Sequence, residues 1–397
     1  MARFEFLTAG ESHGPELTII IRGIPAGLRL DRDGINAELR RRQQGYGRGG
    51  RMAIERDEAI VTAGVRGGET LGSPIAMRIV NRDFEQWRDA MDPWDVDDAD
   101  VERRRLRSPR PGHADLAGGM KFDRRDLRDI LERASARETA ARVAAGGVAK
   151  QLLAHFGIEI RSSVLSIGPV GDPDAEVSWD ALSGRDADSS LPGVDPRLEK
   201  EMIAAIDRAK EDGDTWGGTI AVAANGVPPG LGSTAQWDEK LDGRLAQSLM
   251  SIPAVKGVAI GIGFKAATLP GSEVHDAIDR DPSGFSRRTN RAGGLEGGMT
   301  NGELVLARVA MKPISTLRKG LPSVDLDTGL SKRSQWERSD VTAVPACAVI
   351  CEAMVAMTLA GAMREKFGGD SIGEMERNVS SYLEQVKRYP PGGSPAR

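Results

Sequence analysis

The chain has 397 residues, with 54 Lys and Arg against 58 Asp and Glu, so its formal net charge is −4. This balance argues against wholesale binding to nucleic acid or to an anionic membrane. A composition of 40% hydrophobic and 28% charged residues is close to globular averages and excludes a disordered or fibrous chain. The length is enough for one large core or two ordinary ones.

The first third of the chain predicts short strands that are separated by glycine turns. Ile-rich stretches at residues 18–24, 59–65 and 73–80 are the predicted strands, and residues 31–42 are predicted to be helical. The first residues are charged and have no long apolar core, so they do not form a secretory signal.

The next element is a predicted long helix with Asp123 as its N-cap and an end at Gly157. Gly146 and Gly147 inside it predict close packing against a neighbour. Further elements follow from their apolar patterns: strands at 158–170, 217–227, 255–264 and 302–311, and helices at 196–212, 238–250 and 345–366. Their irregular alternation favours an α+β fold with antiparallel sheets over a doubly wound parallel sheet.

The longest apolar stretch, residues 343–363, predicts a buried helix in a soluble core. Pro345 and Glu352 interrupt it, and a charge near the middle would be costly in lipid. The two cysteines, Cys347 and Cys351, have no partner pair that would complete a metal site. We therefore expect a reduced, cytoplasmic protein with a single domain over residues 1–388 and a disordered tail over residues 389–397.

Two of the four histidines lie in glycine turns, which leaves their rings within reach of a ligand. Ser12 and His13 lie in TAGESHGP, and His113 lies in RPGHAD with Arg110 and Asp115 close by. Both histidines are candidate catalytic residues, although a lone loop histidine is more often structural. A zinc site is not predicted, because no close cluster of His, Cys and carboxylates is present.

Arginine dominates the basic residues: no lysine precedes Lys121, and that segment holds 19 arginines. The planar guanidinium suits bidentate capture of phosphate and carboxylate. The segment RRRQQGYGRGGRM places Arg42, Arg48 and Arg51 around a Gly-Tyr-Gly turn, which is typical of a loop that wraps an anion. A composition bias, or a solvated basic helix end, is the alternative. The segment is neither a Walker loop nor a Rossmann fingerprint.

The segment ERASARE, which begins at Glu132, lies inside the predicted long helix. Arg133 and Arg137 are then four residues apart on one face, with Ser135 between them. These arginines are candidates for ligand binding. The alternative is that Glu132 and Glu138 pair with them in surface salt bridges.

Two later segments complete the candidate site. A glycine-dense stretch, TNRAGGLEGGMTNG, precedes MKPISTL, in which Lys312, Ser315 and Thr316 supply donors for a phosphate. In RSDVTAVPA, Arg338 and Asp340 stand just before the apolar helix. A carboxylate there is stabilised as an anion, so Asp340 is either a helix cap or a base.

In this order, these segments resemble chorismate synthase, and the resemblance covers Phe6 to about Leu383. The family has a β-α-β sandwich with antiparallel sheets around central helices. It converts 5-enolpyruvylshikimate 3-phosphate into chorismate and phosphate, the last common step of the shikimate pathway to aromatic amino acids. This lyase reaction is a 1,4-elimination that needs reduced FMN without net redox change.

The resemblance also implies the residues of the site. The residues expected to bind the substrate are Ser12, Arg42, Arg48, Arg51, Arg110, Ser135, Arg137 and Arg338. The residues expected to bind FMN are Arg133, Ala134, Ser135, Pro253, Ala254, Gly297, Lys312, Pro313, Ile314, Ser315, Thr316 and Arg338. Pro253 stands where a polar residue is often found, and it lacks an N–H donor, so a contact there would use its carbonyl or ring.

By the same resemblance, three residues carry the chemistry. His113 is expected to protonate or neutralise the departing phosphate, His13 to protonate the reduced flavin near N1, and Asp340 to accept the N5 proton. The substrate hydrogen is not acidic, so an ordinary base cannot take it, and the family uses transient electron donation from the flavin.

The source of reduced flavin has two alternatives within the family. One form depends on an external flavin reductase and the other, bifunctional form uses NADPH itself; the missing Rossmann fingerprint favours the first. An NADP phosphate at Arg42 and Arg48 would overlap the substrate arginines. Family members are usually homotetramers.

Outside the family, the rival classes are a flavin reductase that uses NADPH and an RNA-binding protein. The small number of aromatic residues and the net charge of −4 disfavour the RNA-binding protein.

Overall fold

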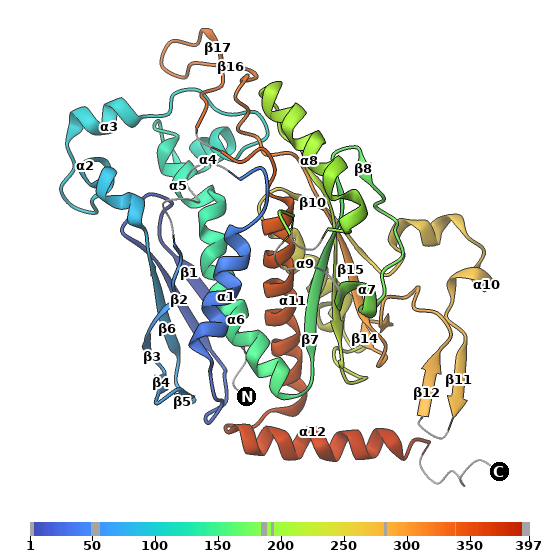
Figure 1. Ribbon diagram of the computed structural model, residues 1–397. Coiled ribbons are helices and arrows are strands. Elements are labelled where there is room, and N and C mark those ends of the chain that lie inside the picture. The colour runs from blue at the N-terminus through green and yellow to red at the C-terminus, as the bar shows by residue number, and fades with distance from the viewer. Residues whose placement is uncertain are drawn as a thin grey trace.

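The protein is a sandwich of two antiparallel sheets with helices between them, which confirms the predicted α+β class (Figure 1). The computed structural model describes residues 4–48, 56–183, 189–191, 194–281, 284–337 and 339–390. The first sheet has the strand order β1-β2-β6-β3, formed by Glu5–Ala9, Glu16–Arg22, Ile75–Val80 and Ile60–Ala63. The second has the order β10-β15-β9-β7-β8, formed by Val255–Ile260, Val305–Met311, Gly218–Asn225, Glu159–Ile167 and Val170–Gly171.

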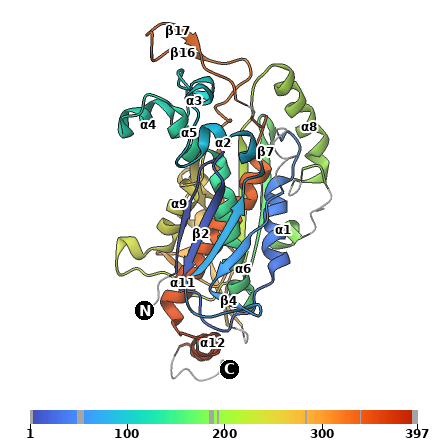
Figure 2. The same cartoon turned by 90° about the vertical axis from the view of Figure 1, so that its left-hand side faces the viewer.

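The first sheet buries one face against the helices. In β2, Leu17, Ile19 and Ile21 are fully buried, whereas Ile20 points to the other face and is exposed. This is the alternation expected when a pleated strand covers a core on one side only. Figure 2, in which this sheet faces the viewer, shows it lying across α6 and α11.

Three helices fill the middle layer: α1 (Arg32–Gln43), α6 (Thr139–His155) and α11 (Val344–Phe367). The predicted close packing of the helical glycines is confirmed. A Cβ atom on Gly146 would lie 2.3 Å from the Cβ of Ala353 in α11, and one on Gly147 would lie 3.3 Å from the Cα of Ile35 in α1. Close approach of α6 to both neighbours therefore requires glycine at these two positions.

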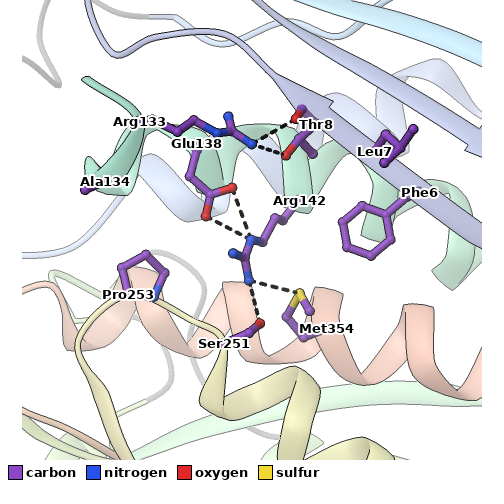
Figure 3. A pocket seen from close by; sticks show the side chains of 10 residues that line it. All are labelled: Phe6, Leu7, Thr8, Arg133, Ala134, Glu138, Arg142, Ser251, Pro253 and Met354. Carbon is purple, nitrogen blue, oxygen red and sulfur yellow. Dashed lines mark hydrogen bonds and ion pairs between the residues drawn. The ribbon is translucent and has the colours of Figure 1, made fainter. Parts of the chain in front are cut away.

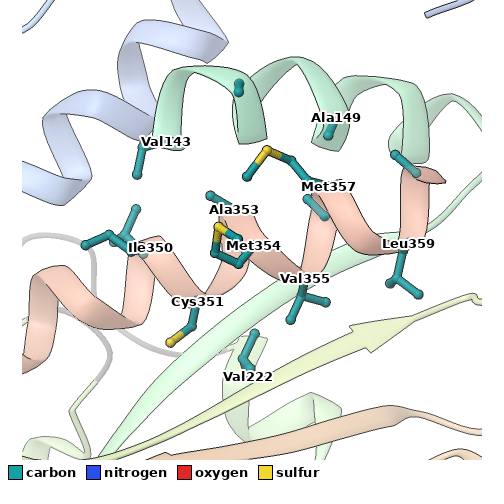
Figure 4. Packing of buried hydrophobic residues seen from close by; sticks show 14 of the residues in the cluster. Val143, Ala149, Val222, Ile350, Cys351, Ala353, Met354, Val355, Met357 and Leu359 are labelled. Atoms are coloured by element: carbon teal, nitrogen blue, oxygen red, sulfur yellow. The ribbon is translucent and has the colours of Figure 1, made fainter. Parts of the chain in front are cut away.

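The apolar helix α11 is a core helix, as its sequence predicts. It is long and apolar enough to cross a membrane, but 89% of its most apolar window is buried inside the protein. Figure 4 shows why: Val143 and Ala149 of α6 line one side of it, and Val222 of β9 lies on the other. A helix that is apolar on all sides is the type that packs between two layers.

Glu352 is the one acidic side chain within this helix up to Met363, and two cations and a hydroxyl from three other elements bind it. Its carboxylate accepts hydrogen bonds from Arg41 at 2.8 Å and 2.9 Å, from Lys150 at 2.5 Å and from Ser162 at 2.6 Å. Burial would raise the pKa of Glu352, but Lys150 and Arg41 hold it at about 2. The charged cluster therefore fixes the C-terminal turn of α1, next to Arg42, against α6 and α11.

The remaining elements surround these layers. In both views, α2 to α5 and the β16–β17 hairpin lie at one end of the sandwich, and α12 lies at the other (Figures 1 and 2). The other α-helices are α2 (Arg88–Met91), α3 (Asp98–Arg104), α4 (Asp115–Phe122), α5 (Arg128–Ala134), α7 (Trp179–Ser183), α8 (Pro196–Glu211), α9 (Leu241–Met250), α10 (Gly271–Val274) and α12 (Ile372–Lys387). The 3-10 helices are η2 (Arg82–Gln86), η3 (Ala136–Glu138), η4 (Trp237–Glu239) and η5 (Gly263–Thr268). The short strands are β4 (Val65–Arg66), β5 (Glu69–Thr70), β11 (Ile278–Asp281), β12 (Gly284–Arg287), β13 (Leu295–Glu296), β14 (Met299–Thr300), β16 (Pro322–Val324) and β17 (Ser331–Arg333).

The single long helix predicted from Asp123 to Gly157 is wrong. Asp123 ends α4 in a left-handed conformation, with φ of 53°, and does not begin a helix. The chain breaks again at Ser135, which is extended with ψ of 143° and whose side chain caps η3. The helical apolar pattern therefore spans three elements, α5, η3 and α6, because Ser135 supplies a local hydrogen bond that competes with helix continuation.

Candidate active site

Arg110, His113 and Asp115 form a tight cluster at the start of α4. His113 Nδ1 lies 2.5 Å from Asp115 Oδ1, and the Arg110 guanidinium donates to both oxygens of the same carboxylate, at 2.8 Å and 2.9 Å. Burial alone would raise the pKa of Asp115, but the hydrogen bonds from His113 and Arg110 outweigh it and hold this pKa well below its usual range. Asp115 is therefore an anion that orients both neighbours.

The segment MKPISTL packs against this cluster. Arg110 Nη1 donates to Thr316 Oγ1 at 3.0 Å, and Ser339 Oγ donates to the Thr316 carbonyl at 2.9 Å. Gly112, with φ of +77°, lies beside this segment, and a Cβ atom there would make an ordinary van der Waals contact with Lys312 Nζ, at 3.7 Å. Burial, and to a smaller extent Lys256, lowers the pKa of Lys312.

His13 lies in a second cluster, built by the N-terminal loop and α5. Its ring Nδ1 is 2.8 Å from Glu132 Oε1, and its main-chain N–H donates to Glu132 Oε2 at 2.7 Å. The neighbouring Ser12 hydroxyl is 3.0 Å from that of Ser135, the residue at which the helix breaks. The break thus places Ser135 beside the histidine loop.

Buried arginines connect the two histidine clusters. Arg137 donates to Asp57 at 2.6 Å, and the other oxygen of Asp57 lies 3.6 Å from Arg42 Nη1. Arg48 lies 3.2 Å from Asp340, the residue after Ser339. Burial and the positive charges of Arg48 and Arg137 outweigh the attraction of Asp57 and Asp340 and lower the pKa of Arg42 to about 10. The cluster is therefore rich in positive charge.

A pocket of about 460 Å³ opens beside Ala134, the residue that precedes Ser135 in the sequence (Figure 3). Arg133, Ala134 and Pro253, three of the residues that the resemblance assigns to FMN, line it together with residues that the sequence did not indicate: Phe6, Leu7, Thr8, Glu138, Arg142, Ser251 and Met354. Arg133 is held by the carbonyl and hydroxyl of Thr8, at 2.8 Å and 2.7 Å. The predicted residue Ala254, with φ of +70°, accepts a hydrogen bond from Lys312 N at 2.9 Å.

Comparison with known proteins identifies the family. The family profile described as chorismate synthase matches residues 4–363. The chorismate synthase of Geobacter sulfurreducens is 54% identical over 392 residues, which cover 97% of this chain and 99% of that protein. That of Moorella thermoacetica is 56% identical over 383 residues, with 96% and 99% covered. The chain belongs to the chorismate synthase family.

A solved structure described as a crystal structure of chorismate synthase agrees with this membership. It matches with a TM-score of 0.79 at 43% identity, and the match covers 98% of this chain and 99% of that one. The predicted sandwich and the predicted lyase activity are therefore confirmed: the reaction of the family is the elimination of phosphate from 5-enolpyruvylshikimate 3-phosphate to give chorismate.

Within this family fold, one predicted arrangement and two of the alternatives left open are wrong. Arg133 and Arg137 do not share a helix face, because the break at Ser135 turns Arg133 toward Thr8 and Arg137 toward Asp57. Glu138 pairs with Arg142, at 2.9 Å, rather than with these arginines on the surface. Asp340 is not a cap of α11, whose N-cap is Ala343; it pairs with Arg48.

One predicted site residue, Gly297, lies outside this network. Gly297 lies in the turn between β13 and β14, packed against Thr234. Arg51 and Arg338 lie outside the described residues. No group of His, Cys, Asp and Glu that could hold a metal ion occurs in the described part of the chain.

The structure also adds residues that the sequence did not single out as functional. Asp57 bridges two of the arginines, and Glu132 binds His13. Neither residue belongs to a sequence motif that marks it as functional, because only the fold brings each one into contact with its partner. Glu132 lies 119 residues from His13.

Proposed function

We propose that the network from His13 to His113 binds 5-enolpyruvylshikimate 3-phosphate, with the guanidinium groups of Arg42, Arg48, Arg110 and Arg137 around its phosphate and carboxylates. The carrying observation is that Arg42, Arg110 and Arg137 are buried, that the Arg48 side chain is only 9% exposed, and that these four arginines outnumber the carboxylates between them, Asp57, Asp115 and Asp340. Arg42 Nη1 is buried and has no hydrogen-bond partner among the described residues. A buried donor of this kind suits an anionic ligand.

Reduced FMN is the proposed cofactor, and the residues present fit it. The pocket is lined by Arg133, Ala134 and Pro253, and Ala254, the residue after Pro253, joins it to the Lys312–Thr316 segment through a main-chain hydrogen bond. Its lining combines arginine cations with apolar side chains such as Phe6 and Met354, which matches a flat ring system bearing a phosphate. When bound, the reduced flavin supplies transient electron donation to the substrate. FMN contacts at Gly297 and Arg338 stay predictions.

Three side chains hold protons in this proposal. His113, fixed by Asp115 and 3.1 Å from Arg110, donates a proton to the departing phosphate or neutralises its charge. His13 would supply a proton to the reduced cofactor when it is bound, and Asp340, held by Arg48, would accept the proton from the N5 position of the cofactor. Arg110 and Arg42 stabilise the negative charge that develops on the phosphate.

We further propose the form that depends on an external flavin reductase, a homotetrameric assembly and a cytoplasmic location. Anaerobic incubation with the enolpyruvyl ester and photoreduced FMN should release phosphate, whereas oxidised FMN with NADPH alone should not. Phosphate release with NADPH and oxidised FMN would support the bifunctional alternative instead. With oxidised FMN and no NADPH, neither the reductase-dependent form nor the bifunctional form is expected to give product.

Substitution of Arg42 tests the anion site. Arg42→Lys keeps one charge but loses the bidentate fork, and we expect KM for the ester to rise about tenfold, which is about 1.4 kcal/mol of binding. Arg32→Gln is the matched control, because Arg32 begins the same helix and is exposed in a pair with Glu58. An unchanged KM in Arg42→Lys would remove Arg42 from the substrate site.

A further inference from the structure

Glu132 binds His13 through both of its carboxylate oxygens. Both oxygens of this carboxylate are used on His13: Oε2 accepts from the main-chain N–H at 2.7 Å, and Oε1 lies 2.8 Å from ring Nδ1. The Glu132 side chain is only 3% exposed. One carboxylate thus fixes the loop and the ring together.

Trp87 holds the ring from its face. The His13 and Trp87 ring centroids are 4.0 Å apart at an interplanar angle of 25°, which is a stacked pair. The Arg104 and Arg128 guanidiniums lie 4.0 Å and 4.9 Å from the Trp87 ring centroid. Stacking and cation–π contacts of this kind restrict rotation of the imidazole.

The charged groups around the pair favour an ionised Glu132. Arg128 Nη1 lies 3.6 Å from Glu132 Oε1, and its Nη2 donates to Glu337 at 3.1 Å. Burial would raise the pKa of Glu132, but the hydrogen bonds from His13 and the charge of Arg128 lower it below its ordinary value. An ionised carboxylate only accepts hydrogen bonds.

We propose that Glu132 is the positioning residue of His13: it fixes the tautomer with the proton on Nδ1 and makes Nε2 the nitrogen that exchanges a proton in the reaction. This inference rests on the proposed role of His13. It assigns Glu132 no contact with substrate or cofactor. Its effect runs through the tautomer and orientation of the ring, as with carboxylates that orient catalytic histidines elsewhere.

The tautomer is measurable without turnover. In protein labelled with 15N-histidine, and at a pH at which His13 is neutral, the ring is expected to carry its proton on Nδ1. The chain has only four histidines, and the His13 signals are assigned by their loss in His13→Gln. A neutral His13 with its proton on Nε2 in the unmutated protein would overturn the proposal, whatever the activity.

Kinetics supply the second readout. Glu132→Gln keeps the shape but can place an amide N–H against Nδ1, so we expect kcat to fall about 10- to 100-fold with little change in KM for the ester, and the pH profile of kcat to shift. Glu132→Asp keeps the charge and should restore part of the lost kcat. The control is Glu376→Gln, which removes the partner of the exposed His155.

The outcomes separate this proposal from the proposed function. If the unmutated protein forms no chorismate with reduced FMN, the proposed function fails, while the NMR result still decides the role of Glu132. If the unmutated protein is active and Glu132→Gln stays within twofold of it, with an unshifted pH profile and a native melting curve, the positioning role is wrong. A Glu132→Gln protein that does not fold leaves Glu132→Asp and the NMR tautomer to decide.

Discussion

Three histidine–carboxylate pairs occur in the part of the chain that the structure describes, and they differ in what else holds the carboxylate. Glu132 accepts from the ring and the main chain of His13, so it fixes one residue twice. Asp115 accepts from Arg110 at both oxygens and its Oδ1 lies 2.5 Å from His113 Nδ1, so it ties the proposed proton donor to a proposed anion-binding group. Glu376 meets His155 at the surface, where both side chains are exposed. The same chemical pair can therefore orient a ring, couple two functional groups or simply join two helices.

The largest expected effects follow from removing the rings of His13 and His113. His13→Ala and His113→Ala should each lower turnover by about 100-fold or more, the usual contribution of a positioned general acid or base. Both ligands should still bind, because the arginines that hold the anions remain. His155→Ala is the matched control and should leave turnover unchanged. Steady-state kinetics with reduced FMN, together with equilibrium binding of the ester, measures both quantities.

Unimpaired turnover in His13→Ala or in His113→Ala would remove that histidine from the mechanism. The pair would then have the same purely structural role as His155 with Glu376. A loss of turnover that is explained wholly by loss of ester binding would place the histidine in the binding site instead.

Asp115→Asn is expected to cost stability as well as activity, because it leaves the buried Arg110 guanidinium without its counter-ion. The loss should be about 3 kcal/mol of unfolding free energy at neutral pH, as for other broken buried pairs. The pKa of Asp115 is depressed in the folded protein, so its stabilising contribution is complete above the ordinary pKa of about 4 and is lost as the pH falls toward the folded value. The two proteins should therefore converge in stability below about pH 4.

Urea denaturation at pH 7 and at about pH 3.5 tests this sign. A stability difference that grows on acidification, or that is absent at pH 7, would contradict the view that Arg110 and His113 share an ionised Asp115. A simultaneous rise in KM for the ester would show that the pair also positions Arg110.

Elements with a local signal were predictable from the sequence. The α1, α8 and α11 helices and the β2, β6 and β9 strands lie close to their predicted positions, because apolar periodicity and turn residues mark them. The strand β1 was missed because its residues, EFLTA, are few and follow a charged start. The α12 helix was missed as well, since only Met375 and Val379 of it are buried.

Within the site, too, the residues with a local sequence signal were predictable and the others were not. The glycine turns around His13 and His113 and the arginine-rich loop could be found in the sequence, because motif and chemistry coincide there. The break at Ser135 could not, since an apolar stripe continues across it and only the hydrogen bonds of Ser135 reveal the turn. The partners Asp57 and Glu132 depend on contacts between segments 80 and 119 residues apart in sequence.

The smallest effect is expected for the exposed pair of His155 and Glu376. Its size tests whether burial sets the strength of the three histidine–carboxylate pairs. His155 Nε2 lies 2.7 Å from Glu376 Oε1, which joins the end of α6 to α12, but the side chains are 36% and 50% exposed. Water screens such a pair, so Glu376→Gln should change the unfolding free energy by less than about 0.5 kcal/mol and should leave turnover unchanged. A double-mutant cycle with His155→Ala isolates the pair itself. The same cycle for His113 and Asp115 gives the value for comparison. Equal coupling energies would mean that the N···O distance, rather than burial and additional partners, sets the strength of these pairs.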